Sequence, residues 1–246
     1  MPHFFISTSD LNQDIITVSD KDNFHHIVKV LRSKVGETLL FIDENRIQYK
    51  AVIKSIDSKT VTTKVVEKQK SNNTLGLNLI LAQAVLKTDA QNLVIQKATE
   101  LGVKKIVPMI TENCVIKASV IDSKREKWQK IADESVKQCE RVDFPIVQER
   151  MSLQEVLNCE EFNIKIVCVE RETSCTLRDC LRSIDIKPSD KIAVIIGPEG
   201  GFSSQELRLL SENNQIYNVS LGKLILRAET AVVAALSNVI YELEND

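Results

Sequence analysis

Glycine-containing loops hold the residues of this chain that are best suited to bind a ligand. Four of its seven glycines fall between residues 192 and 236. Glycine permits a positive φ and, having no Cβ, lets the backbone come close to a ligand. Gly197 and Gly222 each follow a short apolar run that predicts a strand, at 193–196 and 217–221. Open α/β sheets bind ligands at the carboxyl ends of strands, so the loops predict a binding site, although two ordinary strand-to-helix turns would look the same.

An arginine and a glutamate near the second glycine loop could act on a substrate proton. Arg227 and Glu229 lie in the sequence RAET, just beyond Gly222. An arginine stabilises an anion that develops in a reaction, and a carboxylate accepts or relays a proton. The start of a helix explains the same residues, because the helix dipole favours a carboxylate there. Apolar side chains would form the walls between the two loops: Leu221, Ile225 and Leu226.

A helix is expected directly after the first glycine loop, because Ser203 and Glu206 have the spacing of a capping box. Its free N–H groups would offer an anion site, which makes a phosphate-binding nucleotide enzyme an alternative. The sequence GPEGGFSS at 197–204, however, lacks the lysine of a P-loop and the glycine spacing of a dinucleotide-binding fold. This alternative is therefore the weakest.

Histidines and cysteines do not form a catalytic or metal-binding pattern. All three histidines fall within the first 26 residues, and the six cysteines are scattered without a CxxC pair. The carboxyl-terminal part therefore has no histidine for a Ser-His-Asp triad, and we expect no metal site. Buried free thiols explain the cysteines.

Alternating strand and helix patterns from Leu77 onward predict an α/β fold with a mostly parallel sheet. Thr88 and Gln91 have the spacing of another capping box, at the start of the first of these helices. The expected strands are 77–85, 105–110, 146–148, 164–169, 192–196 and 217–221, and the expected helices are 88–101, 123–140, one starting at 203, and 229–243.

The first 70 residues or so are rich in β-branched residues and predict strands at 39–42, 49–53 and 60–66. Residues 23–32 instead have apolar side chains at the spacing of an amphipathic helix. The other face of this helix carries His26, Lys29 and Arg32, which could contact RNA phosphates or form an ordinary solvated face. The polar segment 69–74 is the expected linker.

Composition indicates a globular protein outside the membrane. The chain has 246 residues, a net charge of −2, a pI near 6.0 and a mean hydropathy of −0.09. No segment approaches the roughly 18 consecutive apolar residues of a membrane helix, and the first residues do not look like a secretory signal. We therefore expect a cytoplasmic protein. The net charge neither supports nor excludes an RNA substrate.

Two segments, GPEGGFSSQEL and LGKLILRAETA, closely resemble the paired signatures of the RsmE family. Its members are bacterial enzymes that methylate N3 of a uridine in small-subunit (16S) ribosomal RNA, with S-adenosylmethionine (SAM) as cofactor. The resemblance implies a SPOUT-type, trefoil-knotted α/β domain at 74–246, preceded by a small PUA-like β-barrel at 1–70 that would bind RNA. It also implies a homodimer. The stretches QAVLK, QKATELGV and QCER resemble further family segments.

The family resemblance assigns roles to particular residues. Arg227, Glu229 and Arg141 would be catalytic, and Lys87 would bind RNA together with His26, Lys29 and Arg32. Four positions, Glu140, Lys223, Leu224 and Ala228, depart from the usual family pattern, which leaves room for reduced activity. The residues implied to bind SAM are Glu170, Ile196, Gly197, Gly200, Gly201, Leu221, Gly222, Ile225, Leu226 and Thr230.

Two other functions remain open from the sequence. One is a related SPOUT enzyme that methylates a ribose 2′-oxygen or another base. The other is a non-catalytic RNA-binding or ribosome-assembly protein that has kept the fold. Residue patterns alone do not distinguish either of these functions from methylation of uridine N3.

Overall fold

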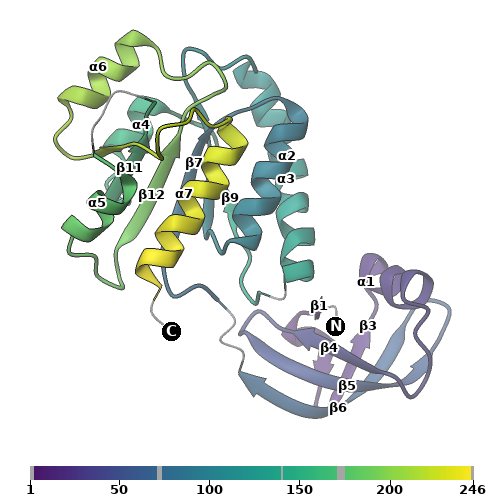
Figure 1. The fold of residues 1–246 in the computed structure, drawn as a ribbon. Helices are drawn as coiled ribbons and strands as arrows, with labels where there is room; N and C mark the ends of the chain where they lie inside the picture. The colour runs from purple at the N-terminus through teal and green to yellow at the C-terminus, as the bar shows by residue number, and fades with distance from the viewer. Residues whose placement is uncertain (1–2, 71–73, 140, 171–174, 245–246) are drawn as a thin grey trace. The chain divides into compact units, whose positions relative to one another are not determined.

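The chain forms two compact units in a computed structural model (Figure 1). The model describes residues 3–70, 74–139, 141–170 and 175–244. The first unit comprises residues 1–74 and 136–143, and the second comprises 75–135 and 144–246. Part of the expected linker, 71–73, lies outside the described residues, as does Glu140. The linker prediction was wrong at Gln69 and Lys70, because both belong to strand β6, which pairs with β5 as far as Lys70.

A six-stranded sheet forms the first unit, in the order β1–β4–β5–β6–β3–β2. The β1–β4 pair is parallel and the other pairs are antiparallel. Buried Phe4, Phe41 and Ile53 belong to its core. The elements are β1 His3–Phe5, η1 Thr8–Asp10, β2 Leu11–Asn12, β3 Ile15–Val18, α1 Lys21–His25, η2 His26–Val30, β4 Thr38–Ile42, β5 Ile47–Ile56 and β6 Val61–Lys70.

The single helix expected at 23–32 is two short pieces, α1 and the π-helical turn η2. A π turn has a longer period than an α-helix, so the apolar stripe does not continue along one face. Ile27 is fully buried, whereas Leu31, expected on the same stripe, is 40% exposed. His26 packs edge-on against the Phe4 ring, 5.5 Å between centroids, and does not share the full exposure of Lys29 and Arg32.

The second unit has a parallel sheet in the order β10–β8–β7–β12–β11–β13, with β9 paired to β8. This confirms the predicted α/β fold with its parallel sheet. The strands are β7 Asn78–Ala84, β8 Lys105–Ile110, β9 Ile146–Val147, β10 Met151–Ser152, β11 Ile164–Cys168, β12 Lys191–Ile196 and β13 Tyr217–Val219. The helices are α2 Thr88–Glu100, α3 Ala118–Cys139, α4 Leu153–Asn158, α5 Leu177–Ser183, α6 Ser204–Glu212 and α7 Ala228–Leu243.

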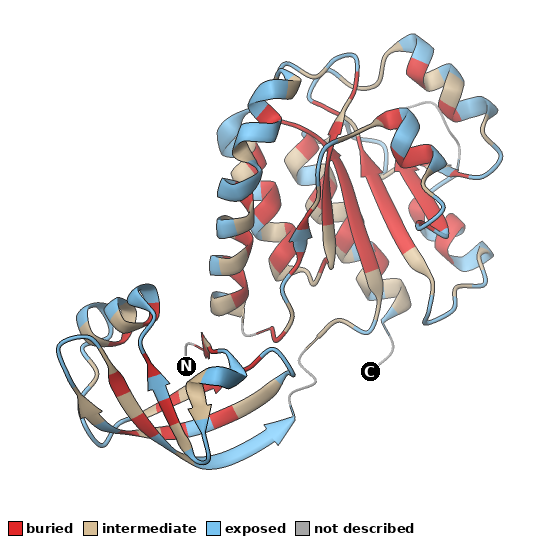
Figure 2. Cartoon of the chain, turned by 180° about the vertical axis from the view of Figure 1, so that it is seen from behind, coloured by how far each residue is buried: buried red, intermediate tan, exposed pale blue. Residues whose placement is uncertain are grey.

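Both faces of this sheet are buried, as the red strands in Figure 2 show. Side chains of successive strand residues point to opposite faces. Leu79 and Leu81 therefore join one core with the buried residues of α2, α3, α5 and α7, while Ile80 and Ala82 join another with those of α4 and α6. A parallel sheet needs such cover on both faces. Among the described residues, no helix combines the length and apolar character needed to span a bilayer.

The start of helix α3 and the cap of helix α2 differ from those expected. Helix α3 begins at Ala118 and not at 123, so that Ile121, 1% exposed, joins the core. The capping box predicted for α2 was wrong: Thr88 is already helical, and the Gln91 side chain accepts the Leu86 N–H at 2.9 Å. The box at Ser203 and Glu206 was confirmed.

Parallel pairing places the carboxyl ends of four strands side by side. Ile196 is in register with Gln83 of β7 and Cys168 of β11, and Cys168 is in register with Val219 of β13. The loops that follow these strands therefore leave the sheet together. After β13 the chain returns across this edge, because α7 packs on α2, α5 and β12.

An ion-pair cluster at the amino ends of the strands should make the stability of the fold depend on pH. Glu161 bonds to the ammonium groups of Lys105 and Lys191, the latter at 2.7 Å. These two bonds, Lys105 first, hold the pKa of Glu161 below its usual value. A lowered folded-state pKa contributes stability above the unfolded pKa, and this contribution is lost as the pH falls through the folded value.

We predict that Glu161→Gln lowers the free energy of unfolding at pH 7 by about 0.5 kcal/mol, since partly exposed pairs contribute about 0–1 kcal/mol. Urea titrations at pH 7 and near pH 3 measure this change. The difference from the wild type should shrink at the lower pH. Glu149→Gln is the control, because Glu149 is 87% exposed and, among the described residues, its carboxylate pairs with Arg125 alone. An equal effect of both variants at pH 7 would contradict the prediction.

Candidate active site

A cavity of about 870 Å³ opens at the carboxyl ends of β7, β11, β12 and β13. Both glycine loops line it, although helix α6 and strand β13 separate them in the chain. They are named here the first glycine loop, residues 197–203, and the second glycine loop, residues 220–227. The lining residues are 87–90, 168–170, 196–202, 207, 220–229 and 231.

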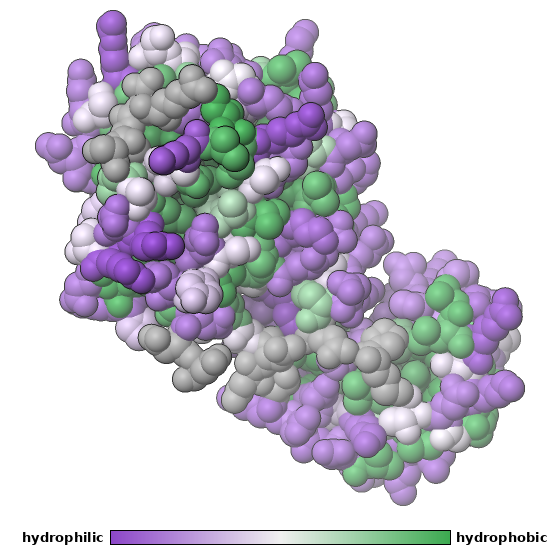
Figure 3. All heavy atoms as spheres, in the orientation of Figure 1, coloured by the Kyte–Doolittle hydropathy of each residue, from purple (hydrophilic) through white to green (hydrophobic). Residues whose placement is uncertain are grey.

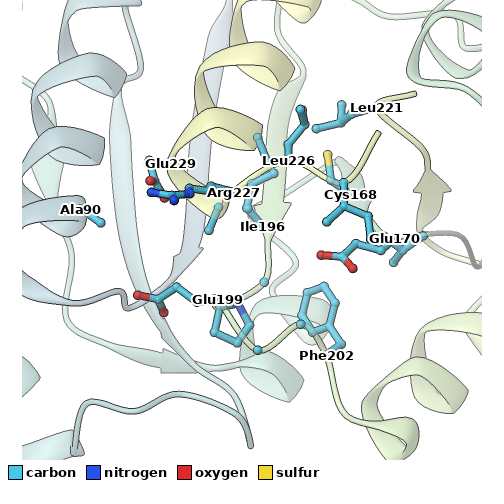
Figure 4. Close-up of a pocket in the computed structure, with 18 of the residues that line it drawn as sticks. Ala90, Cys168, Glu170, Ile196, Glu199, Phe202, Leu221, Leu226, Arg227 and Glu229 are labelled. Carbon is cyan, nitrogen blue, oxygen red and sulfur yellow. The ribbon is translucent and has the colours of Figure 1, made fainter. Parts of the chain in front are cut away.

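The two sides of the cavity differ in chemistry. Figure 4 shows Arg227, Glu229 and Glu199 on one side, and Cys168, Glu170, Phe202 and Leu221 on the other, with Ile196 between them. One side therefore carries both signs of charge, and the other combines apolar walls with the carboxylate of Glu170.

The first glycine loop is tied at its start to β7 and the residues that follow it. The fully buried Gln83 donates from Nε2 to the Gly197 carbonyl at 3.1 Å. Glu199 accepts the backbone N–H of Lys87 at 3.1 Å. Together these two bonds stabilise one loop conformation. Neither Gln83 nor Glu199 was assigned a role from the sequence, although both lie in recognisable motifs.

The farther part of the same loop is tied to the segment after β8. Asn113 donates from Nδ2 to the carbonyls of Gly201 and Gly200, at 3.1 and 3.3 Å. Glu206 accepts the N–H of Glu112 at 3.0 Å. A Cβ on Gly200 would lie 3.2 Å from the Asn113 Cβ, a contact that is tight unless Asn113 shifts. No local sequence signal indicated these contacts.

The second glycine loop is fixed by its own serine and by residues at and just before the start of α5. Ser220 accepts the N–H of Gly222 on Oγ at 3.2 Å and donates to the Gly222 carbonyl at 3.1 Å. Backbone bonds join Ser220 to Cys175 and Leu177. Gly222 has a φ of +131°, a backbone conformation that residues other than glycine rarely adopt.

Hydrophobic side chains remain exposed on the second unit. Figure 3 shows such side chains between hydrophilic ones on the face in view. Leu224, which departs from the family pattern, is 81% exposed, and Ile225, expected as a wall, is 54% exposed. Leu221 and Leu226 are half-buried and line the cavity.

Arg227 and Glu229 lie where α7 begins. Arg227 is the N-cap residue but makes no capping bond with its side chain, and Glu229 is in the first turn. Within the described part of the chain, neither side chain has an ion-pair partner within 4.0 Å. Ala228 between them is 8% exposed. Both charged groups are therefore available to a ligand in the cavity.

Other predicted site residues lie elsewhere. Arg141 belongs to the first unit, is 6% exposed and pairs through Nε with Asp143 at 3.0 Å. Thr230 is in the first turn of α7 but outside the cavity wall. The catalytic role of Arg141 and the cofactor role of Thr230 stay predictions. Lys87 lines the cavity, whereas the predicted RNA-binding residues of the first unit form a separate group: His26, Lys29 and Arg32.

The thiol of Cys168 in the cavity wall has low reactivity. Burial, with a smaller contribution from the neighbouring Cys180, raises the pKa of Cys168 to about 12. The thiolate is the reactive form of cysteine. At neutral pH Cys168 is therefore a neutral, apolar part of the wall.

Known protein families match almost the whole length of the chain. A family model described as an RNA methyltransferase domain matches residues 73–240. A second model, described as an RNA methyltransferase PUA domain, matches residues 18–66.

Individual proteins match over most of their own lengths as well. The chain is 32% identical over 224 residues to ribosomal RNA small subunit methyltransferase E of Rickettsia conorii, covering 91% of this chain and 88% of that protein. It is similar to a methyltransferase of Legionella pneumophila solved with bound SAM, at 30% identity, a TM-score of 0.83 and 96% coverage of both chains. The corresponding values for ribosomal RNA small subunit methyltransferase E of Neisseria gonorrhoeae, also bound to SAM, are 29%, 0.79, and 97% and 96% coverage.

We predict that Gly222→Ala raises the Kd for SAM about tenfold. A side chain at a φ of +131° strains the loop by about 1–2 kcal/mol, and relief of that strain would move the cavity wall. Isothermal titration calorimetry measures the change. Gly36→Ala is the matched control, since Gly36 has a φ of +93°, lies in the first unit and has open space around it. It should lower the melting temperature and leave the Kd unchanged; a Kd of Gly222→Ala equal to that of the control would contradict the prediction.

Proposed function

Since the chain belongs to the ribosomal RNA small subunit methyltransferase E family, we propose that it transfers a methyl group from SAM to N3 of a uridine in small-subunit ribosomal RNA. One observation carries the proposal: both glycine loops line the same cavity as Arg227 and Glu229.

The residues of the cavity fit SAM. Its volume of about 870 Å³ lies within the range of roughly 300–1,000 Å³ that is usual for small-molecule sites. Exposed loop backbone around Gly197 and Gly222 can bond to an adenine edge and a ribose, and Glu170 can accept from ribose hydroxyls. Ile196, Leu221 and Leu226 offer apolar contacts. SAM, when bound, supplies an electrophilic methyl group on a sulfonium, so positioning is the main task of the protein.

Removal of the N3 proton is the step that needs side chains. The Arg227 guanidinium stabilises the uridine anion as the proton leaves. The Glu229 carboxylate accepts or relays that proton. Both groups lie on the charged side of the cavity (Figure 4), across from the wall that would hold the cofactor. The charged side of the cavity therefore receives the RNA base, with Lys87 in the cavity wall available for phosphate.

Finer features of the fold belong to the same proposal. We propose two domains, 1–70 and 74–246, and a trefoil knot in the second. Support for the knot is the return of the second glycine loop across the sheet edge to reach α7. The first domain is proposed to be a PUA-like barrel, because register shifts at Lys50/Ala51 and Ile53/Ser55 mark bulges that curve a sheet.

The cellular setting is also proposed. RNA contact by Lys29 and Arg32 is supported by their exposure, and a cytoplasmic location follows from an RNA substrate of the ribosome. A homodimer is proposed by analogy with the family, as the resemblance implies.

We predict that Arg227→Ala lowers kcat about 10²- to 10³-fold, as expected for a lost group that stabilises a developing anion. The Kd for SAM should change less than twofold, because Arg227 faces the substrate side. Methyl incorporation into small-subunit RNA and calorimetry measure the two quantities. Arg208→Ala is the control, since Arg208 is exposed on α6 and outside the cavity wall. Full activity of Arg227→Ala would remove Arg227 from the catalytic residues.

Analysis of the RNA product tests the proposed reaction itself. Digestion to nucleosides should yield N3-methyluridine. A methyl group on a ribose 2′-oxygen or on another base would overturn the proposed substrate atom. Absence of SAM binding at millimolar concentration would instead favour an RNA-binding or assembly protein.

A further inference from the structure

The segment after β8 contacts the first glycine loop without lining the cavity. We call residues 111–114 the brace loop. Asn113 makes its two bonds from this segment to the carbonyls of Gly200 and Gly201. None of residues 111–114 is part of the cavity wall. The brace loop therefore acts on the outer side of a loop whose Glu199 and Phe202 reach the cavity (Figure 4).

Glu206 joins the brace loop to helix α6 through an unusual use of its carboxylate. One oxygen, Oε2, accepts the Ser203 N–H at 2.8 Å and completes the capping box. The other, Oε1, accepts the Glu112 N–H at 3.0 Å. The residue is only 7% exposed. Glu206 thus does two separate things: it caps α6 and it links two loops.

A second capping box in the chain shows that the first task does not require the second. In α4, Glu155 accepts both the N–H and the hydroxyl of Ser152 on one oxygen, at 2.6 and 2.8 Å. Glu155 is exposed, and no other described residue is hydrogen-bonded to its carboxylate. Burial and the link to Glu112 are therefore additions specific to Glu206.

The brace loop has firm attachments of its own. It follows directly from β8, which is paired on both sides. Thr111 is 6% exposed, and its carbonyl accepts the Cys114 N–H at 3.1 Å. The Cys114 thiol lies 3.8 Å from the carbonyls of Val85 and Met109. The brace loop is thus held by the sheet and can hold another segment.

We infer that Glu206 and Asn113 are positioning residues that keep the first glycine loop in its SAM-binding conformation. The ligand named here rests on the proposed function. Three glycines in five residues give this loop many accessible conformations in the absence of restraint, and ordering them on binding would weaken affinity. Bonds made before SAM arrives remove that cost.

Calorimetry with SAM and thermal unfolding of the full chain test the inference in the wild type and three variants. Glu206→Gln replaces one accepting oxygen by an NH₂ group that cannot accept, and should raise the Kd about tenfold. Asn113→Ala removes both bonds to the glycine carbonyls, and should raise the Kd about threefold. Because Asn113 is exposed, this variant stays folded. Glu155→Gln, the matched control, should lower the melting temperature as Glu206→Gln does but leave the Kd within twofold of the wild type.

Hydrogen exchange of the ligand-free protein gives a readout independent of SAM. Amides of residues 197–203 should exchange faster in Glu206→Gln and Asn113→Ala than in the wild type and in Glu155→Gln. Unchanged exchange, or equal Kd changes in Glu206→Gln and Glu155→Gln, would overturn the inference. If the wild type fails to bind SAM, the proposed function fails, and the exchange of 197–203 alone decides whether the brace exists.

Discussion

Backbone carbonyls of the first glycine loop are satisfied by donors from other segments, and the cavity depends on this constraint. Glycine contributes no side chain that could fix the loop from within. Gln83 bonds to the start of the loop, and Asn113 bonds to its farther part. Glu206 of the following helix, α6, bonds to Glu112, which belongs to the same brace loop as Asn113. Bonds from Gln83 and Asn113, which do not line the cavity, stabilise the loop and leave its inner surface open for a ligand.

The register of the parallel strands is the second requirement for the cavity. Parallel pairing in the order β7–β12–β11–β13 brings the loops after these four strands together, even though β13 follows β12 only after helix α6 in the chain. Because α7 packs on α2 and β12, the second glycine loop must cross the ends of the strands. The crossing places the start of α7, with Arg227 and Glu229, in the wall of the cavity that the first loop forms.

Local patterns in the sequence predicted the elements and missed the contacts between them. The apolar runs and glycines gave β12, β13 and both loops, and the spacing of Ser203 and Glu206 gave the start of α6. The same spacing at Ser152 and Glu155 marks α4, which was not expected. Side-chain bonds such as that of Asn113 to Gly201 leave no periodic trace, because the partners lie 88 positions apart. Helix η2 shows the converse failure: its apolar spacing fits an α-helix, but the segment forms a π turn in which Ile27 is buried.

The quiet thiol of Cys168 has a consequence for an enzyme that handles an alkylating agent. A sulfonium methyl donor reacts with soft nucleophiles, and a thiolate in the wall would compete with the RNA base for the methyl group. With the pKa of Cys168 raised to about 12, the thiol remains protonated at neutral pH. The burial that packs this strand thereby also protects the protein from modifying itself.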